Sequence, residues 1–427
     1  MVTWINDPKQ ILLTRWPNTS KTKGEIYKAV QPIIEEVSKH GDKALIEYTY
    51  RFDGTKLMGD SIKVSEEELE NSIKLITEVQ LRALKEAKRR LEIVEQRRLQ
   101  LLNFTTVFDG VTVRSISKPI SSVGCYVPGG RASYPSSLLM NVIPAKIADV
   151  GKVVVCTPPN ANGEIDTLTL AAAQLCGVDQ VFRVGGAQAI AALAFGTETI
   201  PHVDKIVGPG NMYVTAAKEL VSSTVSIDKP AGPSEIVVLA DETADPKLII
   251  LDLISQAEHG PGGLCGLVTD SKRLAEEVEK LLDERIKVAP KNDEISKILD
   301  ETGFIYVTNE IGAAIEFVES IAPEHLEIMA EQSTEISKKI TTAGLVLLGD
   351  YTPVAATDYC MGTNHVLPTG GYGRINSGLT VLDFVKTINV VESTKEGLEE
   401  VRENIRALSS AEGLPNHGLA VEGRFTS

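Results

Sequence analysis

The chain has 427 residues, of which 43% are hydrophobic and 24% are charged, and its formal net charge is −15. This composition is ordinary for a globular protein, and the length suggests two to four domains with substantial cores. The negative charge argues against general nucleic-acid binding, because no basic face would attract phosphate. Neither a membrane span nor a secretory signal is expected, because no apolar run approaches ~18 residues and the start has no basic or apolar leader region. We therefore expect a cytoplasmic protein.

The first ~100 residues are predicted to be mainly helical. Ser65 and Glu68 have the spacing of a capping box. Behind them, apolar residues with helical spacing run from Leu69 to Val94 between charged residues. This pattern predicts one long charged helix, which is more typical of a scaffold or an inter-subunit surface than of a site.

Short β-branched runs and helical stretches then alternate, which predicts a parallel, doubly wound sheet. The predicted elements are 111–117, 153–156, 168–175, 181–184, 187–194, 206–207 and 212–221. A second series follows a hinge at 229–233, and it comprises 236–240, 246–257, 266–269, 275–282, 304–307, 311–321 and 344–348. The last ~50 residues, with a strand near 386–391 and a helix over 398–408, are too few to fold alone and are expected to dock elsewhere.

Three glycine turns lie at the ends of predicted strands, although no G-x-G-x-x-G fingerprint is present. They are Tyr126–Gly130, Gly185–Gln188 and Gly208–Tyr213. The last of these either contacts an anion at a helix N-terminus or is a simple turn. Because ligands bind at the carboxyl ends of strands in open α/β sheets, three such turns in one domain favour a nucleotide-sized ligand.

Four of the six histidines lie in the last 170 residues, each beside carboxylates or amides: His259, His325, His365 and His417. Metal binding and proton transfer need such residues, so together they favour a metalloenzyme site in the C-terminal half. The five cysteines form no C-x-x-C spacing and are expected to be structural or incidental.

Each local pattern also has a structural interpretation. Gln256 and His259 share one helical face and suit zinc, but a histidine is also favoured at a helix C-terminus. Glu324 and His325 suit general base work, but Pro and Glu also begin helices. Asp358 is expected in a loop after the strand 345–348, the usual place for a ligand residue. His417 is expected in a loop, where a histidine is often merely exposed.

Seven strings, taken in this order, resemble the histidinol dehydrogenase family from about residue 25 to the end. They are Tyr126–Gly130, Gly208–Asn211, Ala231–Glu235, Gln256–His259, Ala322–Glu327, Asn364–Thr369 and Glu412–His417. With this resemblance we expect two Rossmann-like doubly wound domains lacking the fingerprint, a helical N-terminal part and a small C-terminal extension. We divide the chain into an N-terminal segment (1–24), a discontinuous catalytic domain (25–120 and 234–378), an inserted NAD-binding domain (121–233) and a C-terminal domain (379–427) that completes the partner's site.

The resemblance implies an NAD-dependent oxidation of L-histidinol through L-histidinaldehyde to L-histidine, the last step of histidine biosynthesis. It also implies one zinc ion per site and a homodimer with intertwined subunits and shared active sites. The residues that match the family's motifs would be Glu324 and His325 as the catalytic pair, Gln256, His259, Asp358 and His417 as zinc ligands, and Tyr126, Gln188 and Asn211 as NAD contacts. Substrate would be held by Ser234, Gln256, His259, His325, Asp358, Glu412 and His417.

This chemistry would use a neutral His325 to remove the hydroxyl proton and Glu324 to activate the water for the second oxidation. Zinc would chiefly orient the substrate, and NAD would carry the redox chemistry. Three other hypotheses remain: a relative that oxidises another small amino or sulfonated alcohol, a zinc hydrolase with Glu324 as base, and a binding module without catalysis. The role of His365 stays unassigned.

Overall fold

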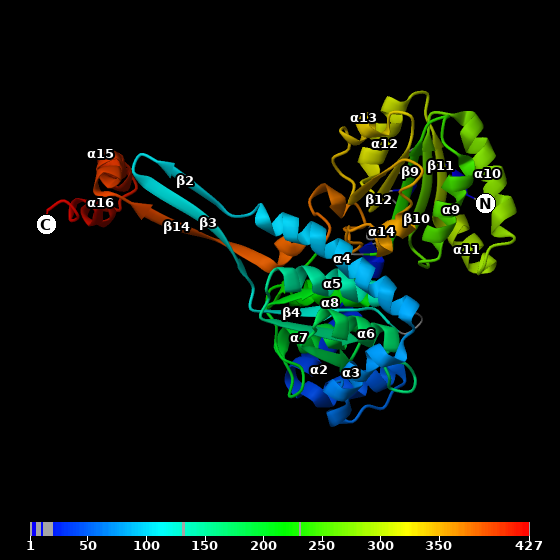
Figure 1. The fold of residues 1–427 in the computed structure, drawn as a ribbon, viewed down its shortest axis with the longest axis horizontal. Coiled ribbons are helices and arrows are strands. Elements are labelled where there is room, and N and C mark those ends of the chain that lie inside the picture. Colours follow the sequence, from blue (N-terminus) through cyan, green and yellow to red (C-terminus); the bar gives the residue numbers. More distant parts are fainter. Residues whose placement is uncertain (1, 6–9, 12–19, 130–132, 230–231, 427) are drawn as a thin grey trace.

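The computed structural model describes residues 2–5, 10–11, 20–129, 133–229 and 232–426. Two parallel sheets form the centres of two lobes (Figure 1). The hinge predicted at 229–233 falls partly outside the described residues, because Pro230 and Ala231 are not among them. No helix within the described ranges is long and apolar enough to cross a membrane.

The first lobe contains a five-stranded parallel sheet in the order β6-β5-β4-β7-β8. Its strands are β4 (Ser122–Tyr126), β5 (Lys152–Thr157), β6 (Gln180–Arg183), β7 (Lys205–Val207) and β8 (Ser226–Ile227). The helices that connect them are α5 (Pro135–Ile147), α6 (Thr167–Cys176), α7 (Gly186–Phe195) and α8 (Met212–Val221). Two apolar clusters flank this sheet, as expected for a doubly wound sheet with both faces covered.

The second lobe contains a six-stranded parallel sheet in the order β1-β11-β10-β9-β12-β13. Its strands are β1 (Thr3–Trp4), β9 (Glu235–Ala240), β10 (Leu264–Thr269), β11 (Gly303–Val307), β12 (His325–Met329) and β13 (Leu345–Leu348). The helices are α9 (Pro246–Ala257), α10 (Lys272–Ile286), α11 (Asn292–Thr302), α12 (Ile311–Ile321), α13 (Ser333–Ser337) and α14 (Val354–Tyr359). Apart from β1, its strand order is the same as in the first lobe, so the prediction of two similar α/β units is confirmed.

The N-terminal helices belong to the first lobe, and the prediction that 25–120 joins 234–378 is wrong in this respect. Val30 and Leu45 of α2 (Ser20–Asp53) share an apolar cluster with Phe182 of β6. Leu91 of α4 (Glu78–Gln100) shares another with Val123 of β4. An apolar stripe shows that a helix packs against something, but it does not identify which sheet covers it.

The predicted long helix is broken into α3 (Glu66–Leu75) and α4. Ser65 caps α3 through the Glu68 N–H, but the Glu68 side chain pairs with Arg183 and does not complete a capping box. The break follows Ile76, because Thr77 and Gln80 form a reciprocal capping box that begins a new helix.

A long arm projects away from both lobes and carries the C-terminus at its tip (Figure 1). It is an antiparallel sheet of β2 (Phe104–Phe108), β3 (Val111–Pro119) and β14 (Val385–Ser393), followed by α15 (Lys395–Ala411) and α16 (Pro415–Glu422). The arm begins later than the predicted boundary at 379, because Leu379, Val381 and Phe384 are fully buried in the first lobe's core. It also includes a hairpin from the N-terminal third of the chain.

Candidate active site

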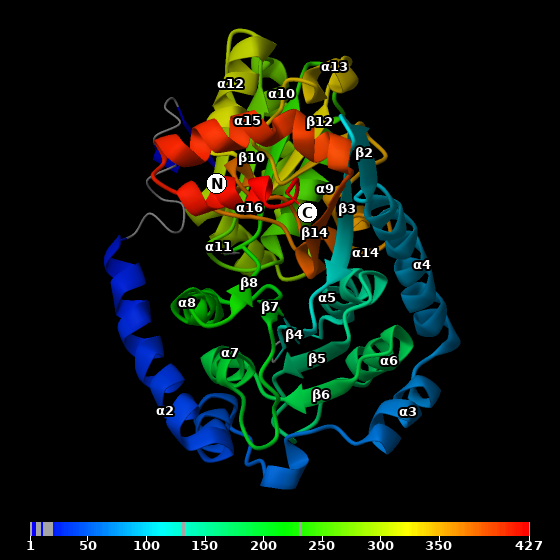
Figure 2. The same cartoon turned by 90° about the vertical axis from the view of Figure 1, so that its left-hand side faces the viewer.

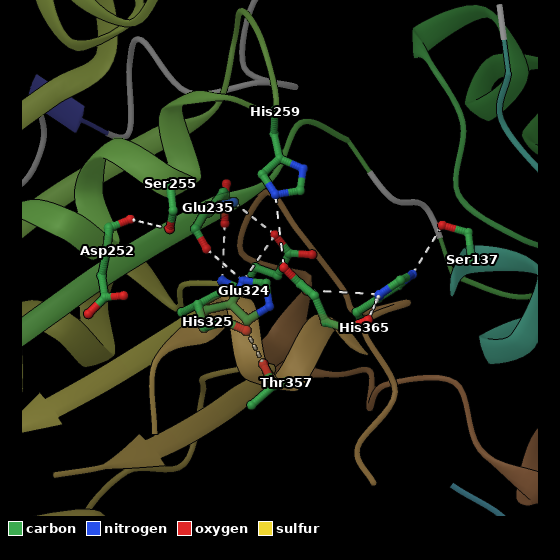
Figure 3. Close-up of polar contacts among 11 residues, drawn as sticks. Ser137, Glu235, Asp252, Ser255, His259, Glu324, His325, Thr357 and His365 are labelled. Carbon is green, nitrogen blue, oxygen red and sulfur yellow. Dashed lines mark hydrogen bonds and ion pairs between the residues drawn. The ribbon is translucent and has the colours of Figure 1, made fainter. Parts of the chain in front are cut away.

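A cluster of carboxylates and histidines lies at the amino ends of the second-lobe strands (Figure 3). Glu235 is the first residue of β9, and His325 is the first residue of β12, where it pairs in register with Ile236. The alternative of a helix start at Glu324 is therefore wrong. Asp358 lies in the short helix α14, not in the loop that the sequence predicted directly after β13. That helix contacts α9, which carries Gln256.

Glu324 and His325 are both buried and face each other. The His325 Nδ1 atom is 3.5 Å from Glu324 Oε2 and 2.9 Å from the backbone oxygen of Glu235. Because a hydrogen bond to a carbonyl needs Nδ1 to carry a proton, the neutral imidazole has its lone pair on Nε2. Nε2 is buried and has no hydrogen-bond partner within the described ranges. This is the arrangement that a general base requires.

The electrostatics of the pair differ from the neutral His325 that the sequence predicted. Burial opposes a charge on His325, but the Glu324 carboxylate and then Asp358 outweigh it and raise the pKa of His325 to about 9. Burial also raises the pKa of Glu324. Without ligands, the site therefore favours an imidazolium at His325 at neutral pH. A bound cation near His325 would favour loss of its proton.

Three of the four predicted zinc ligands come together in a cavity of about 660 Å³ lined by residues of both lobes. Gln256 and Asp358 line it with His259, whose Nε2 is 4.0 Å from an Asp358 carboxylate oxygen. Burial lowers the pKa of His259 and raises that of Asp358 to about 6. The Gln256 amide nitrogen is buried without a partner in the described part of the chain. An amide, a neutral imidazole and a carboxylate fit zinc, whose preferred geometry takes a fourth ligand.

His417 and Glu412 do not join this cluster within one chain. Both are exposed at the tip of the arm, far from α9 and α14 in Figure 1. His417 lies in the helix α16, not in the predicted loop, and Glu412 ends α15. Among the described residues, no group of three or more His, Cys, Asp and Glu side chains could hold a metal by itself. The site is therefore incomplete in a single chain if the fourth ligand is His417.

The three residues expected to contact NAD gather at the carboxyl ends of the first-lobe strands. The Tyr126 hydroxyl accepts the Gly186 N–H (3.1 Å), and Asn211 caps α8 through two backbone N–H groups. Gln188 is buried, and neither polar atom of its side chain has a partner among the described residues. A Cβ on Gly208 would lie 2.0 Å from the backbone carbonyl oxygen of Tyr126, so this close approach requires a glycine. Helix starts beside strand ends are where nucleotides bind in such sheets.

The sequence assigns no role to two polar residues near the Glu324–His325 pair, His365 and Glu235. His365 bridges the lobes, because its Nδ1 is 2.9 Å from the Asp358 carbonyl oxygen and its Nε2 is 3.1 Å from the Ser137 hydroxyl of α5. Glu235 contacts both predicted catalytic residues, although the sequence assigns it no role beyond its place in the string Ala231–Glu235. Ser234 precedes it, and its backbone oxygen accepts the Leu264 N–H. A carboxylate at the start of an apolar strand was the signal available for Glu235.

These features define a two-lobed α/β enzyme with a buried glutamate–histidine pair, three neighbouring side chains of types that can bind a metal and a separate cluster of glycine turns at strand ends. The histidinol dehydrogenase family model matches residues 17–425. A histidinol dehydrogenase of Methanothermobacter thermautotrophicus is 46% identical over 403 residues, covering 94% of each chain. That of Methanosarcina mazei is 42% identical over 422 residues, covering 99% of this chain and 97% of its own. The crystal structure of histidinol dehydrogenase from Elizabethkingia anophelis covers 100% of this chain and 94% of its own, at a TM-score of 0.89 and 36% identity.

This chain belongs to the histidinol dehydrogenase family. It is accordingly an NAD-dependent oxidoreductase of histidine biosynthesis. The match covers both lobes and the arm, so the family resemblance noted from the seven sequence strings is confirmed.

Proposed function

We propose that this chain oxidises L-histidinol through L-histidinaldehyde to L-histidine, using two molecules of NAD and one zinc ion per site. The observation that carries this proposal is the buried Glu324–His325 pair beside Gln256, His259 and Asp358. Overall, one alcohol, one water and two NAD⁺ give one carboxylate, two NADH and three protons. The chain must therefore remove protons twice and activate one water.

Zinc, when bound, would supply a Lewis acid that orients the substrate's imidazole and amine. Gln256, His259 and Asp358 would hold it from one subunit, and His417 from another. NAD, when bound, would accept the hydride in each step. Tyr126, Gln188 and Asn211 would hold it, and the unpartnered amide of Gln188 supports a polar ligand there.

In the first oxidation, His325 removes the hydroxyl proton at Nε2 as hydride leaves the carbinol carbon. The Glu235 carbonyl keeps the Nδ1 proton in place, so the lone pair stays on Nε2. In the second oxidation, Glu324 takes a proton from the water that adds to the aldehyde, and the hydrated aldehyde then loses hydride. A raised pKa suits Glu324 to hold that proton inside a buried site. Ser234, with the zinc ligands, His325 and Glu412, would hold the substrate.

The arm supports a homodimer in which each active site is shared. Its sheet exposes apolar side chains to solvent, namely Phe104, Val107, Phe108, Ile388, Val390 and Val391. The register places Phe104, Phe108 and Val391 on one face of the sheet and Val107, Ile388 and Val390 on the other. Exposed apolar side chains on both faces of a projecting sheet suggest that another protein surface covers it. We therefore infer that the arm packs on a second copy and delivers Glu412 and His417 to that copy's site.

The cytoplasmic location expected from the sequence stays a prediction.

The test measures NADH absorbance and histidine formation with zinc-loaded protein. We expect two NADH per histidinol consumed. NADH formation would also argue against the alternative of a zinc hydrolase, which needs no NAD. Phenylalaninol is the matched control, because it keeps the amine and alcohol but lacks the imidazole ligand, and it should react at least ~100-fold more slowly. Equal turnover of both alcohols would favour a relative with another substrate. No NADH from either would refute the proposal.

A further inference from the structure

Glu235 contacts both members of the catalytic pair, although no role has been given to its side chain. It is 3% exposed and begins β9, next to β12. Figure 3 shows it facing Glu324 and His325. A buried carboxylate is costly unless its hydrogen-bonding capacity is satisfied, so its partners indicate what it does there.

Each of the two glutamates accepts the backbone N–H of the other through its side-chain carboxylate. The Glu235 carboxylate accepts the Glu324 N–H (3.2 Å), and the Glu324 carboxylate accepts the Glu235 N–H (2.8 Å). The other carboxylate oxygen of Glu235 accepts the Gly370 N–H (3.1 Å). One side chain thus connects the starts of two neighbouring strands to the loop after Pro368.

These contacts satisfy groups that the sheet leaves open. The parallel β9–β12 register begins with His325 opposite Ile236, so the N–H groups of Glu235 and Glu324 lie just before the paired residues of these two strands. A buried N–H without a partner costs about 1–3 kcal/mol. The Glu235 carboxylate lies near a second carboxylate, and burial and then the charge of Glu235 raise the pKa of Glu324. An apolar side chain would avoid that repulsion but could not hold the Glu324 backbone.

We propose that Glu235 is a positioning residue for the catalytic pair. Its carboxylate fixes the Glu324 backbone and the Gly370 loop, and its backbone carbonyl fixes the imidazole of His325. It acts through Glu324 and His325 and needs no contact with substrate. This inference rests on the proposed function, because it assigns Glu324 a role in the reaction.

The test compares Glu235→Gln and Glu235→Ala with wild type. A misplacement of about 1 Å can slow a reaction ~100-fold, so we expect kcat to fall ~10- to 100-fold in Glu235→Ala, with KM for histidinol within ~3-fold. Glu235→Gln keeps one acceptor oxygen and should recover part of this loss. Both variants should impair aldehyde oxidation more than alcohol oxidation, because only the aldehyde step uses Glu324 to activate water.

The pH profile provides a readout that a merely structural role would not change. Removing the Glu235 charge lowers the pKa of Glu324, so the limb of aldehyde oxidation that reports Glu324 should move to lower pH in Glu235→Gln. Zinc content should stay that of wild type.

Glu95→Gln is the matched control. Glu95 is also a buried glutamate whose carboxylate accepts a backbone N–H, that of Val381, but it lies on α4 outside the site. Its substitution should lower the thermal midpoint without changing kcat or the pH profile. If Glu235→Gln behaves like Glu95→Gln, or loses zinc and both half-reactions equally, the positioning role is refuted. If wild type itself forms no NADH from histidinol, the proposed function fails instead.

Discussion

A buried pair of carboxyl groups lies beneath the site, and it should make the second lobe less stable as the pH rises. Glu327 is fully buried in β12, where its carboxyl group lies beside that of Asp252 of α9. Burial, followed by the charge of Asp252, raises the pKa of Glu327 to about 9, and burial raises that of Asp252 to about 6. Two carboxyl groups can share a hydrogen bond only while one keeps its proton. Near neutral pH that proton belongs mainly to Glu327.

The direction follows from which state binds the proton more tightly. Glu327 has a higher pKa in the folded chain than the ordinary value of 4.5. Its contribution to stability is therefore fully present below pH 4.5 and is lost as the pH rises to about 9. Asp252 has its titration midpoint near pH 6, so most of its own effect lies below pH 6.5. Between pH 6.5 and 9, at about 1.4 kcal/mol per pH unit, the loss due to Glu327 should be about 3 kcal/mol.

The substitution Glu327→Gln removes this pH dependence. The amide can donate a hydrogen bond to Asp252 at every pH in this range. With about 2–4 °C per kcal/mol for a domain of this size, the thermal midpoint of wild type should fall ~6–12 °C relative to Glu327→Gln between pH 6.5 and 9. The scans should use EDTA-treated protein, because zinc affinity is itself pH-dependent.

Glu316→Gln is the matched control, because Glu316 is exposed on α12 of the same lobe. Its midpoints should follow those of wild type at each pH. Asp252→Asn should reduce the pH dependence only in part, because it removes the charge of Asp252 but leaves Glu327 buried. Parallel curves for wild type and Glu327→Gln, within about 2 °C, would show that Glu327 does not keep a proton in the folded chain and would refute the reasoning.

Four further predictions concern the site itself. His259→Ala and Asp358→Ala should each abolish zinc retention with unchanged circular dichroism, and wild-type zinc content in both would contradict the ligand assignment. Glu324→Gln should slow aldehyde oxidation more than alcohol oxidation, whereas equal losses would argue against its role with water. The pKa of His325 is raised to about 9 in the ligand-free site and should be lower with a cation bound, so kcat/KM for histidinol should rise with pH along a limb below 9, and a profile without that limb would argue against His325 as the base. Hybrid dimers of the double variant Glu324→Ala/His325→Ala with His417→Ala should regain one working site; inactive hybrids of confirmed composition would show that each subunit builds its own site.

The order of strands and helices could be predicted from sequence because it depends on local periodicity. The strand at 236–240 and the helices at 212–221 and 246–257 match the observed residues. Long-range packing could not be predicted in the same way. The apolar faces of α2 and α4 are visible in the sequence, but nothing local indicates that they cover the first-lobe sheet. Similarly, the sequence around His417 predicts a loop where the structure has the helix α16, because its few apolar residues do not show a helical face.

The location of the catalytic pair could not be predicted because the general rule for α/β sheets places ligands at the carboxyl ends of strands. The predicted NAD contacts of the first lobe agree with that rule, since Tyr126 ends β4 and Gln188 lies in the first turn of α7 after β6. The second lobe has the same strand order, but Glu235 and His325 begin their strands. Amino ends of parallel strands expose N–H groups, and these groups can bind carboxylates. Two acidic residues there hold each other through backbone N–H groups, and the histidine beside them is held through a carbonyl. Under the proposed function, one sheet topology would therefore bind NAD at the carboxyl ends of the strands in the first lobe and position an acid–base pair at the amino ends in the second.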